Sequence, residues 1–291
     1  MFKILRQSFN AGVVTTDYPA KPVETSPIFR GRPVFDFSRW KDARPAAEIC
    51  PTSAIEVKDD SDARMVTVDY GKCIFCGLCA DASPEKAIRI SRECELAVQN
   101  RADLVIQAKY KLNRDGCQDH LIEICKTPSI SASAVEVAGK RFKEEIAHIL
   151  GRSLHIREVD AGSCNGCEIE IVNLTGPVYD IERFGIHFVA SPRHADMLLV
   201  TGPVTRNMEL ALRKTYEATP DPRLVVAVGA CGCSGGIFGE NYASLGGVDK
   251  VIPVDVYIPG CPPCPQALLH GILLAVQRLQ QKLIKSRGRS V

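Results

Sequence analysis

The sequence has no long apolar run, few aromatic residues and almost no net charge. No stretch approaches the roughly 18 consecutive apolar residues that a membrane-spanning helix needs. Residues 1–10 also lack the apolar core of a secretion signal. The net charge is only +2, so nothing indicates a nucleic-acid surface, and we expect no nucleic-acid partner. Together these absences favour a cytoplasmic protein.

Cysteine, in contrast, is abundant, with 13 residues in a chain of 291. A reducing compartment disfavours structural disulfides, so clustered cysteines there indicate metal ligands or redox groups. The length exceeds that of one average domain, and 45% of the residues are apolar. The chain is therefore expected to form two domains, each with its own core.

Three stretches of the chain differ in composition and in the spacing of their apolar residues. Residues 1–45 are rich in proline and glycine, which predicts an extended arm that lies on another part of the structure. Residues 94–150 show apolar spacing that we interpret as a helical connector. From Leu154 onward, short apolar runs alternate with helical stretches. The runs are residues 197–200, 224–228 and 254–258, and the helices are residues 206–216 and 265–285.

This alternation of strand and helix predicts a parallel sheet with helices on its faces. Ligands of such sheets bind beyond the carboxyl ends of the strands. Several cysteines of the C-terminal half fall there, because Cys231 and Cys261 each follow a predicted strand.

The first cysteine group has the spacing C-x2-C-x2-C, at Cys73, Cys76 and Cys79. Bacterial ferredoxins combine this spacing with a fourth cysteine that precedes a proline and comes from a second motif. Cys50-Pro51 provides that fourth ligand here. The sequence therefore predicts one [4Fe–4S] cluster, held by Cys50, Cys73, Cys76 and Cys79.

Ferredoxins with two such motifs hold two clusters, and the ligands of the second cluster are missing in this chain. Its four positions are occupied by Trp40, Ala43, Ala46 and Ser83. One complete ligand set is lost and the other is intact, which indicates a domain built for two clusters that keeps one. A structural zinc knuckle is the alternative, but zinc usually takes paired C-x2-C units.

The second cysteine group begins with a C-x2-C pair, Cys164 and Cys167. Alone, this pair is compatible with zinc or with a redox dithiol. Cys231 and Cys261 change that interpretation, because they belong to the same edge of the predicted sheet, where four thiolates can meet. The stretch 229–236 does not match the G-x-G-x-x-G dinucleotide fingerprint. Its glycines instead let backbone amides approach sulfur.

Residues 154–168, which end in GSCNGCE, closely resemble the small subunit of membrane-bound, energy-converting [NiFe]-hydrogenases. The formate hydrogenlyase type is the nearest. Residues 229–231 and 259–263 fall where that family carries its third and fourth cluster ligands. The resemblance implies a flavodoxin-like domain with a proximal [4Fe–4S] cluster, held by Cys164, Cys167, Cys231 and Cys261.

The N-terminal part resembles the ferredoxin-type subunit of the same complexes, through residues 30–33 (RGRP) and 72–77 (KCIFCG). The chain thus looks like a fusion of two neighbouring subunits. The expected fold is an α+β ferredoxin-like N-terminal domain and an α/β flavodoxin-like parallel-sheet C-terminal domain. The expected boundaries are 1–93 for the arm and first cluster, 94–150 for the connector and 151–291 for the second cluster.

A related subunit, of 20 kDa, occurs in NADH-quinone oxidoreductase. That family typically has two adjacent cysteines where this chain has C-x2-C, so the spacing favours the hydrogenase branch. The resemblance implies an oxidoreductase subunit that relays electrons between an external donor and a catalytic large subunit with the [NiFe] site. A formate dehydrogenase module or a ferredoxin would be the donor. Membrane-integral subunits would hold the chain on the cytoplasmic face of the membrane.

Two alternatives remain open at this point. One is a subunit like that of respiratory complex I, which passes electrons to quinone, and the other is a zinc-stabilised scaffold. Neither half of the sequence offers a catalytic constellation of its own, so no catalytic residue is predicted. The five remaining cysteines are interpreted as packing residues, because a cubane has only four corners. They are Cys94, Cys117, Cys125, Cys233 and Cys264.

Overall fold

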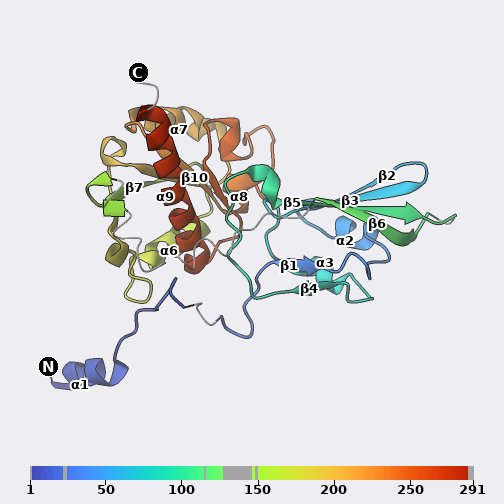
Figure 1. The fold of residues 1–291 in the computed structure, drawn as a ribbon, viewed down its shortest axis with the longest axis horizontal. Coiled ribbons are helices and arrows are strands. Elements are labelled where there is room, and N and C mark those ends of the chain that lie inside the picture. The colour runs from blue at the N-terminus through green and yellow to red at the C-terminus, as the bar shows by residue number, and fades with distance from the viewer. Residues whose placement is uncertain (1, 22–24, 115, 127–145, 148–149, 288–291) are drawn as a thin grey trace.

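The computed structural model describes residues 2–21, 25–114, 116–126, 146–147 and 150–287. The protein is of the mixed α/β type, with a parallel sheet in the C-terminal half and antiparallel sheets in the N-terminal half (Figure 1). The two halves of the chain lie side by side, and the described segments before residue 30 run along the lower side of the view.

The C-terminal sheet has five parallel strands in the order β11-β10-β9-β7-β8. Counted from β7, this order is 2-1-3-4-5, which is consistent with a flavodoxin-like domain. Strands β9 and β10 are buried at every residue, as expected for central strands of a parallel sheet. The strands predicted over 197–200, 224–228 and 254–258 are confirmed. The five are β7 (Leu154–Asp160), β8 (Ile186–Phe188), β9 (Met197–Thr201), β10 (Leu224–Val228) and β11 (Val256–Ile258).

Helices cover both faces of this sheet. Leu269 and Ile272 of the long C-terminal helix are fully buried and share one core with Leu199 and Val226 of the central strands. On the other face, Leu212 belongs to a second core. The helices predicted over 206–216 and 265–285 are confirmed. The helices of this half are α6 (Gly166–Leu174), α7 (Arg206–Ala218), α8 (Gly229–Ser234) and α9 (Pro265–Arg287).

The described residues of the N-terminal half, after the N-terminal arm, form two antiparallel sheets and two short helices. One sheet pairs β1 with β4, and the other has the strand order β2-β3-β5-β6. The helices pack beside β2 and β4. The elements are β1 (Pro33–Phe35), α2 (Arg44–Glu48), β2 (Ile55–Asp59), β3 (Ala63–Asp69), α3 (Leu78–Asp81), β4 (Ile88–Ile90), β5 (Val105–Leu112) and β6 (Gln118–Lys126).

The helical connector expected over 94–150 is wrong for its central part, because residues 105–112 and 118–126 form strands β5 and β6. The reason is visible in the side chains of β5. Ile106, Ala108 and Tyr110 are buried and alternate with less buried neighbours, which is the period of a strand rather than of a helix. Residues 127–145 and 148–149 of the expected connector lie outside the described residues.

The extended arm expected over 1–45 is wrong at its beginning, where helix α1 (Phe2–Ala11) forms. The prolines of this region start only at Pro19, so nothing interrupts helical geometry before it. Beyond the helix, the arm lies on the C-terminal half. The Thr16 amide donates to Val178 O at 2.9 Å, and the Arg183 guanidinium donates to Tyr18 O at 2.8 Å.

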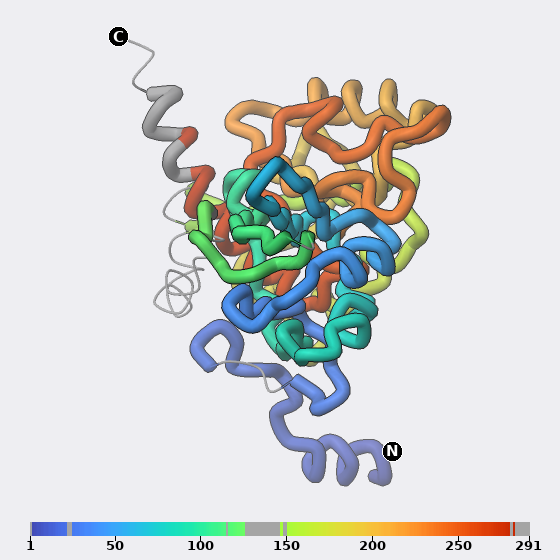
Figure 2. The backbone as a smooth tube through the Cα atoms, turned by 90° about the vertical axis from the view of Figure 1, so that its right-hand side faces the viewer, coloured from blue at the N-terminus to red at the C-terminus, as the bar shows by residue number. Residues whose placement is uncertain are grey.

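The two halves share a junction. Val98 forms an antiparallel bridge with Tyr257 of β11, and the second core continues from the parallel sheet into the N-terminal sheet. Figure 2 shows the N-terminal half, blue to green, against the orange C-terminal half. Among the described helices, none has the length and apolar character to cross a membrane.

One charged side chain is entirely buried in the N-terminal sheet. Arg64 has no exposed surface, and its guanidinium donates to Asp59 at 2.7 Å, to Asp42 at 3.0 Å and to Gly116 O at 3.0 Å. The guanidinium holds the pKa of Asp59 far below its usual range. A buried cation of this kind is tolerated only because its donors are satisfied.

Candidate metal centres

The first cysteine set gathers around one cavity of the N-terminal half. Cys50 follows α2, Cys73 and Cys76 lie in the loop between β3 and α3, and Cys79 is within α3. All four line the cavity, together with apolar side chains that include Phe35. The structure thus brings together four thiols that are spread over about 30 positions of the sequence, in an apolar setting suited to an iron–sulfur cluster.

The cysteines of this set are half-buried and lie close to one another. Burial, opposed by an amide hydrogen bond and reinforced by the neighbouring cysteines, raises the pKa of Cys73 to about 12, and burial raises that of Cys79 to about 11. Such thiols become thiolates when a bound metal supplies positive charge. Backbone amides are already directed at the sulfurs: Ala54 N lies 3.2 Å from Cys50 Sγ, and Phe75 N lies 3.4 Å from Cys73 Sγ.

Tightly packed side chains occupy the positions where the second ligand set of a two-cluster ferredoxin would lie. Trp40, Ala43 and Ala46 are almost completely buried, and the Trp40 ring stacks on Phe35 at 5.3 Å. Gln118 of β6 closes this region, because it accepts from the Ala43 amide at 2.7 Å and donates to the Trp40 carbonyl at 3.0 Å. A well-packed core leaves no room for a cluster there.

The second cysteine set lies at the carboxyl edge of the parallel sheet. Cys164 and Cys167 flank the start of α6 after β7, Cys231 is in α8 after β10, and Cys261 follows β11. The four thiols are near enough to perturb one another. The pKa of Cys167 is raised by burial first, then by Glu168 and the other three cysteines. Burial also raises the pKa of Cys231 to about 11.

Glycines hold the backbone against these sulfurs. A Cβ atom at Gly229 would lie 2.8 Å from Cys167 Sγ, and one at Gly236 would lie 2.7 Å from Cys231 Sγ. Both glycines also have positive φ angles, 79° and 56°, which side-chain-bearing residues rarely adopt. The two glycines therefore form a cradle at this edge of the sheet that leaves room for the sulfurs of Cys167 and Cys231.

No three His, Cys, Asp or Glu side chains of the described ranges are close enough to hold a single metal ion. A cubane makes a different demand, because each of its four thiolates binds a different iron atom. Four thiols gathered in each half fit the donor set of a [4Fe–4S] cluster, and the first set adds backbone amides that point at two of its sulfurs.

Two carboxylates beside the second set were not found by sequence reasoning as a pair. The Thr201 hydroxyl bonds to Glu168 and lies 3.3 Å from Glu158 Oε1. Burial, and then the charge of Glu168, raises the pKa of Glu158. In the sequence both look like ordinary charged residues, since the strand register that brings Thr201 of β9 between them is a tertiary feature.

The five other cysteines occupy different environments. Cys233 is buried in the second core. Cys94 is buried too, and it hydrogen-bonds with Cys264, which holds the pKa of Cys264 below its ordinary value. Packing roles therefore suit these three. Cys117 and Cys125 differ, because they are exposed and contribute to no core.

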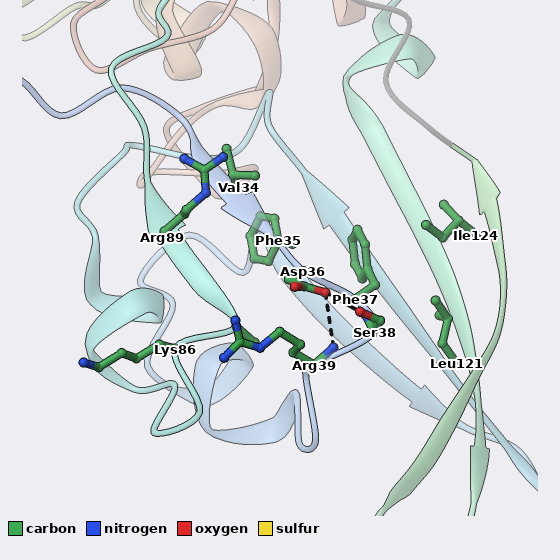
Figure 3. A pocket seen from close by; sticks show the side chains of 11 residues that line it. Val34, Phe35, Asp36, Phe37, Ser38, Arg39, Lys86, Arg89, Leu121 and Ile124 are labelled. Atoms are coloured by element: carbon green, nitrogen blue, oxygen red, sulfur yellow. Dashed lines mark hydrogen bonds between the residues drawn. The ribbon is translucent and has the colours of Figure 1, made fainter.

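A separate pocket opens between β4 and β6, with a volume of about 480 Å³ (Figure 3). Its inner wall is apolar, and the exposed side chains of Arg39, Lys86 and Arg89 lie at its rim. The one acidic lining residue, Asp36, is engaged with its own loop, since it accepts from Ser38 and from the Arg39 amide. Phe35 lines both this pocket and the cavity of the first cysteine set.

Two family models match the chain. Residues 164–275 match the 20 Kd subunit of NADH ubiquinone oxidoreductase, and this range includes all four cysteines of the second set. Residues 66–88 match the 4Fe-4S binding domain and include three cysteines of the first set. The chain belongs to the family of the 20 Kd subunit, which also comprises hydrogenase subunits, and it is a subunit of a redox complex.

Three relatives illustrate the range of this family. A probable membrane-bound hydrogenase subunit of Pyrococcus furiosus is 50% identical over half of this chain and 89% of its own length. Formate hydrogenlyase subunit 7 of Escherichia coli is 51% identical over half of this chain and 57% of its own length. An NADH-quinone oxidoreductase subunit of Citrifermentans bemidjiense is 48% identical over 42% of this chain and 69% of its own length. The resemblance expected from residues 154–168 is confirmed.

Proposed function

We propose that the chain relays electrons within a membrane-bound complex of the hydrogenase or formate hydrogenlyase type, through two [4Fe–4S] clusters. The observation that carries this proposal is the gathering of two four-thiol sets, one in each half. Cys50, Cys73, Cys76 and Cys79 would hold one cluster in a ferredoxin-like domain, and Cys164, Cys167, Cys231 and Cys261 the other. When bound, each cluster accepts and releases one electron at a time.

The junction between the halves supports a relay inside one chain. Ser234 Oγ lies 2.9 Å from the carbonyl oxygen of Gly71. Gly71 is two residues from Cys73, and Ser234 is three residues from Cys231. A short path of covalent bonds and one hydrogen bond therefore connects a ligand of each set. The protein's contribution to such a relay is spacing, burial and potential.

The partner at the far end would be a catalytic large subunit with the [NiFe] site. The C-x2-C spacing of Cys164 and Cys167 favours this branch over the quinone-reducing one, which typically has adjacent cysteines. Membrane-integral subunits would keep the chain on the cytoplasmic face. The expected domain division, 1–93, 94–150 and 151–291, is better drawn with β5 and β6 in the ferredoxin-like part, since β5 pairs with β3 and β6 pairs with β5 in one sheet.

We infer that the external electron donor docks at the pocket of Figure 3, with an acidic surface. Three basic side chains surround the opening, and Phe35 lies between its wall and the cavity of the first set. Charge complementarity of this kind accelerates the encounter of two proteins. A ferredoxin or a formate dehydrogenase module would fill this role.

Metal analysis tests the relay. The purified chain should contain about eight iron atoms and as much acid-labile sulfide. Cys76→Ala should remove about four iron atoms and leave the second cluster's signal in electron paramagnetic resonance, and Cys261→Ala should do the reverse. Zinc at about two atoms per chain, without iron, would instead support the scaffold alternative and end the electron-transfer proposal.

Reduction kinetics test the docking pocket. Arg89→Glu should slow reduction of the chain by an acidic donor, because a charge that attracts the donor is reversed. The rate of reduction should also depend less on salt concentration than in the parent. The matched control is Arg193→Glu, an exposed position on the other half, which should leave the rate unchanged. Equal slowing by both variants would mean that only net charge matters, and no slowing by Arg89→Glu would remove this pocket from the proposal.

A further inference from the structure

Helix α1 has no buried residue, although it contains four large apolar side chains. Phe2 is 88% exposed, Phe9 is 86% exposed, and Ile4 and Leu5 are also open to solvent. Figures 1 and 2, from perpendicular directions, both show the helix projecting from the packed body. An exposed group of apolar side chains on this scale marks an interaction site.

The apolar side chains lie on one side of the helix. Phe2, Leu5 and Phe9 are spaced i, i+3 and i+7, so they share a face of an α-helix. The opposite face has Lys3, Arg6, Gln7 and Asn10. Directly after the helix, Val13 is 91% exposed and extends the apolar surface. Such a helix has one side made for an apolar medium and one side made for water.

The charges of α1 indicate what kind of apolar surroundings the helix contacts. Lys3 and Arg6 are basic, and residues 2–11 contain no acidic side chain. Helices with aromatic residues on one face and only basic charges on the other lie in the headgroup region of anionic bilayers. The helix spans 10 residues, far fewer than the roughly 20 needed to cross a bilayer, so it would rest on the surface.

We propose that α1 is an interfacial anchor that inserts Phe2, Leu5 and Phe9 into the surface of an anionic lipid bilayer, with Lys3 and Arg6 at the phosphates. The chain then contacts the membrane directly as well as through partner subunits. Because α1 has no buried residue and stands apart from both cysteine sets, this anchor does not depend on the clusters.

Vesicle sedimentation of the full chain tests the anchor. The probes are vesicles of phosphatidylcholine alone and vesicles with about one quarter phosphatidylglycerol. Each basic side chain near an anionic surface strengthens binding about fivefold, so two should favour the anionic vesicles by roughly 25-fold. The excess should fall as salt is raised. Equal pelleting with both vesicles would overturn the assignment of Lys3 and Arg6.

Matched variants separate the two faces of the helix. Phe2→Ser with Phe9→Ser should abolish pelleting, whereas Gln7→Ser with Asn10→Ser, on the polar face, should not. Lys3→Glu with Arg6→Glu should remove the preference for anionic lipid. All variants should keep the iron content of the parent, since none of these side chains is buried.

The alternative is that a groove of a partner protein, rather than a lipid bilayer, covers α1. If the parent chain does not pellet with either vesicle, yet Phe2→Ser with Phe9→Ser releases it from the detergent-solubilised complex, a partner subunit covers α1 and the lipid proposal is overturned. If neither vesicles nor the complex respond to these changes, α1 has no docking role and the proposal fails as well.

Discussion

Arg101 Nη2 lies 2.7 Å from Asp69 Oδ2, while Arg101 Nε donates to the carbonyl of Cys233 at 2.9 Å. Asp69 ends β3 of the N-terminal half, and Cys233 belongs to α8 of the C-terminal half. One guanidinium thus joins the two parts of the chain, next to segments that hold a cysteine of each set. The side chains of Arg101 and Asp69 are both largely shielded from solvent.

Arg101→Gln should therefore weaken the junction. The change leaves Asp69 and the Cys233 carbonyl without their charged donor, which costs about 2 kcal/mol for hydrogen bonds to charged groups. Thermal unfolding followed by circular dichroism should show a lower midpoint. The control is Lys21→Gln, whose pair with Asp17 is exposed on both sides and should matter little. Equal midpoints for Arg101→Gln and the parent would contradict this assignment.

A second prediction separates steric contact from backbone strain at the glycine cradle. Gly229→Ala should eliminate the C-terminal cluster, about four iron atoms, because its Cβ would collide with Cys167 Sγ. Gly239→Ala is the control. Gly239 has a positive φ of 60° as well, but nothing lies within 4 Å of a Cβ there. That variant should lose only about 1–2 kcal/mol of stability and keep its iron.

Comparable iron loss in both glycine variants would mean that left-handed backbone geometry alone maintains the site. Full iron content in Gly229→Ala would mean that the cluster tolerates a methyl group beside Cys167, and the cradle would then have no steric role.

A third prediction concerns the missing ligand set. Ser83→Cys should not raise the iron content above that of the parent, because Trp40, Ala43 and Ala46 still supply no thiolate and fill the space. The Ser83 hydroxyl accepts from the Ala87 amide at 3.2 Å, so a modest loss of stability is the expected effect. Iron analysis checks it, and a gain of about four iron atoms would show that the ligand register is wrong.

A fourth prediction follows from the depressed pKa of Asp59. The folded state keeps this carboxylate ionised beside Arg64, whereas the unfolded chain protonates it near pH 4. Because the folded pKa is the lower one, the pair stabilises the fold above about pH 4, and this stabilisation is lost as the pH falls further. Asp59→Asn should lower the unfolding midpoint at pH 7 and converge with the parent in acid.

The exposed pair again supplies a reference for this pH series. Asp17→Asn, opposite Lys21, should follow the parent at every pH, because both side chains are exposed. A gap between the parent and Asp59→Asn that does not depend on pH would show that the variant acts through packing rather than through ionisation.

The C-terminal half was the more predictable one. Leu224–Val228 is an unbroken apolar run, and Pro265 opens a helix with apolar residues at regular helical spacing. Buried parallel strands and long amphipathic helices leave strong patterns. The cysteine spacing likewise predicted which thiols lie near one another in each half. Three cysteines of the first set and two of the second are close together in the sequence, and their role as cluster ligands stays a prediction.

The N-terminal half was harder to predict. The strand period of β5 depends on Ala108 and Tyr110, which a count of large aliphatic residues overlooks. Helix α1 was hidden by the later prolines of its region. The roles of Arg101 and Gln118 could not be predicted at all, because their partners, Cys233, Ala43 and Trp40, are 75 to 132 positions away. Only the tertiary fold brings such groups together.

The bridge between Val98 and Tyr257 has a consequence for anyone who divides the chain. Strand β11 is an edge strand of the parallel sheet, and Val98 exchanges both of its backbone hydrogen bonds with Tyr257 of this strand. A fragment that began at residue 151 would leave this edge strand uncovered, and other molecules could then pair with it. The two units, though recognisable as separate modules by sequence, are therefore best produced and handled as one piece.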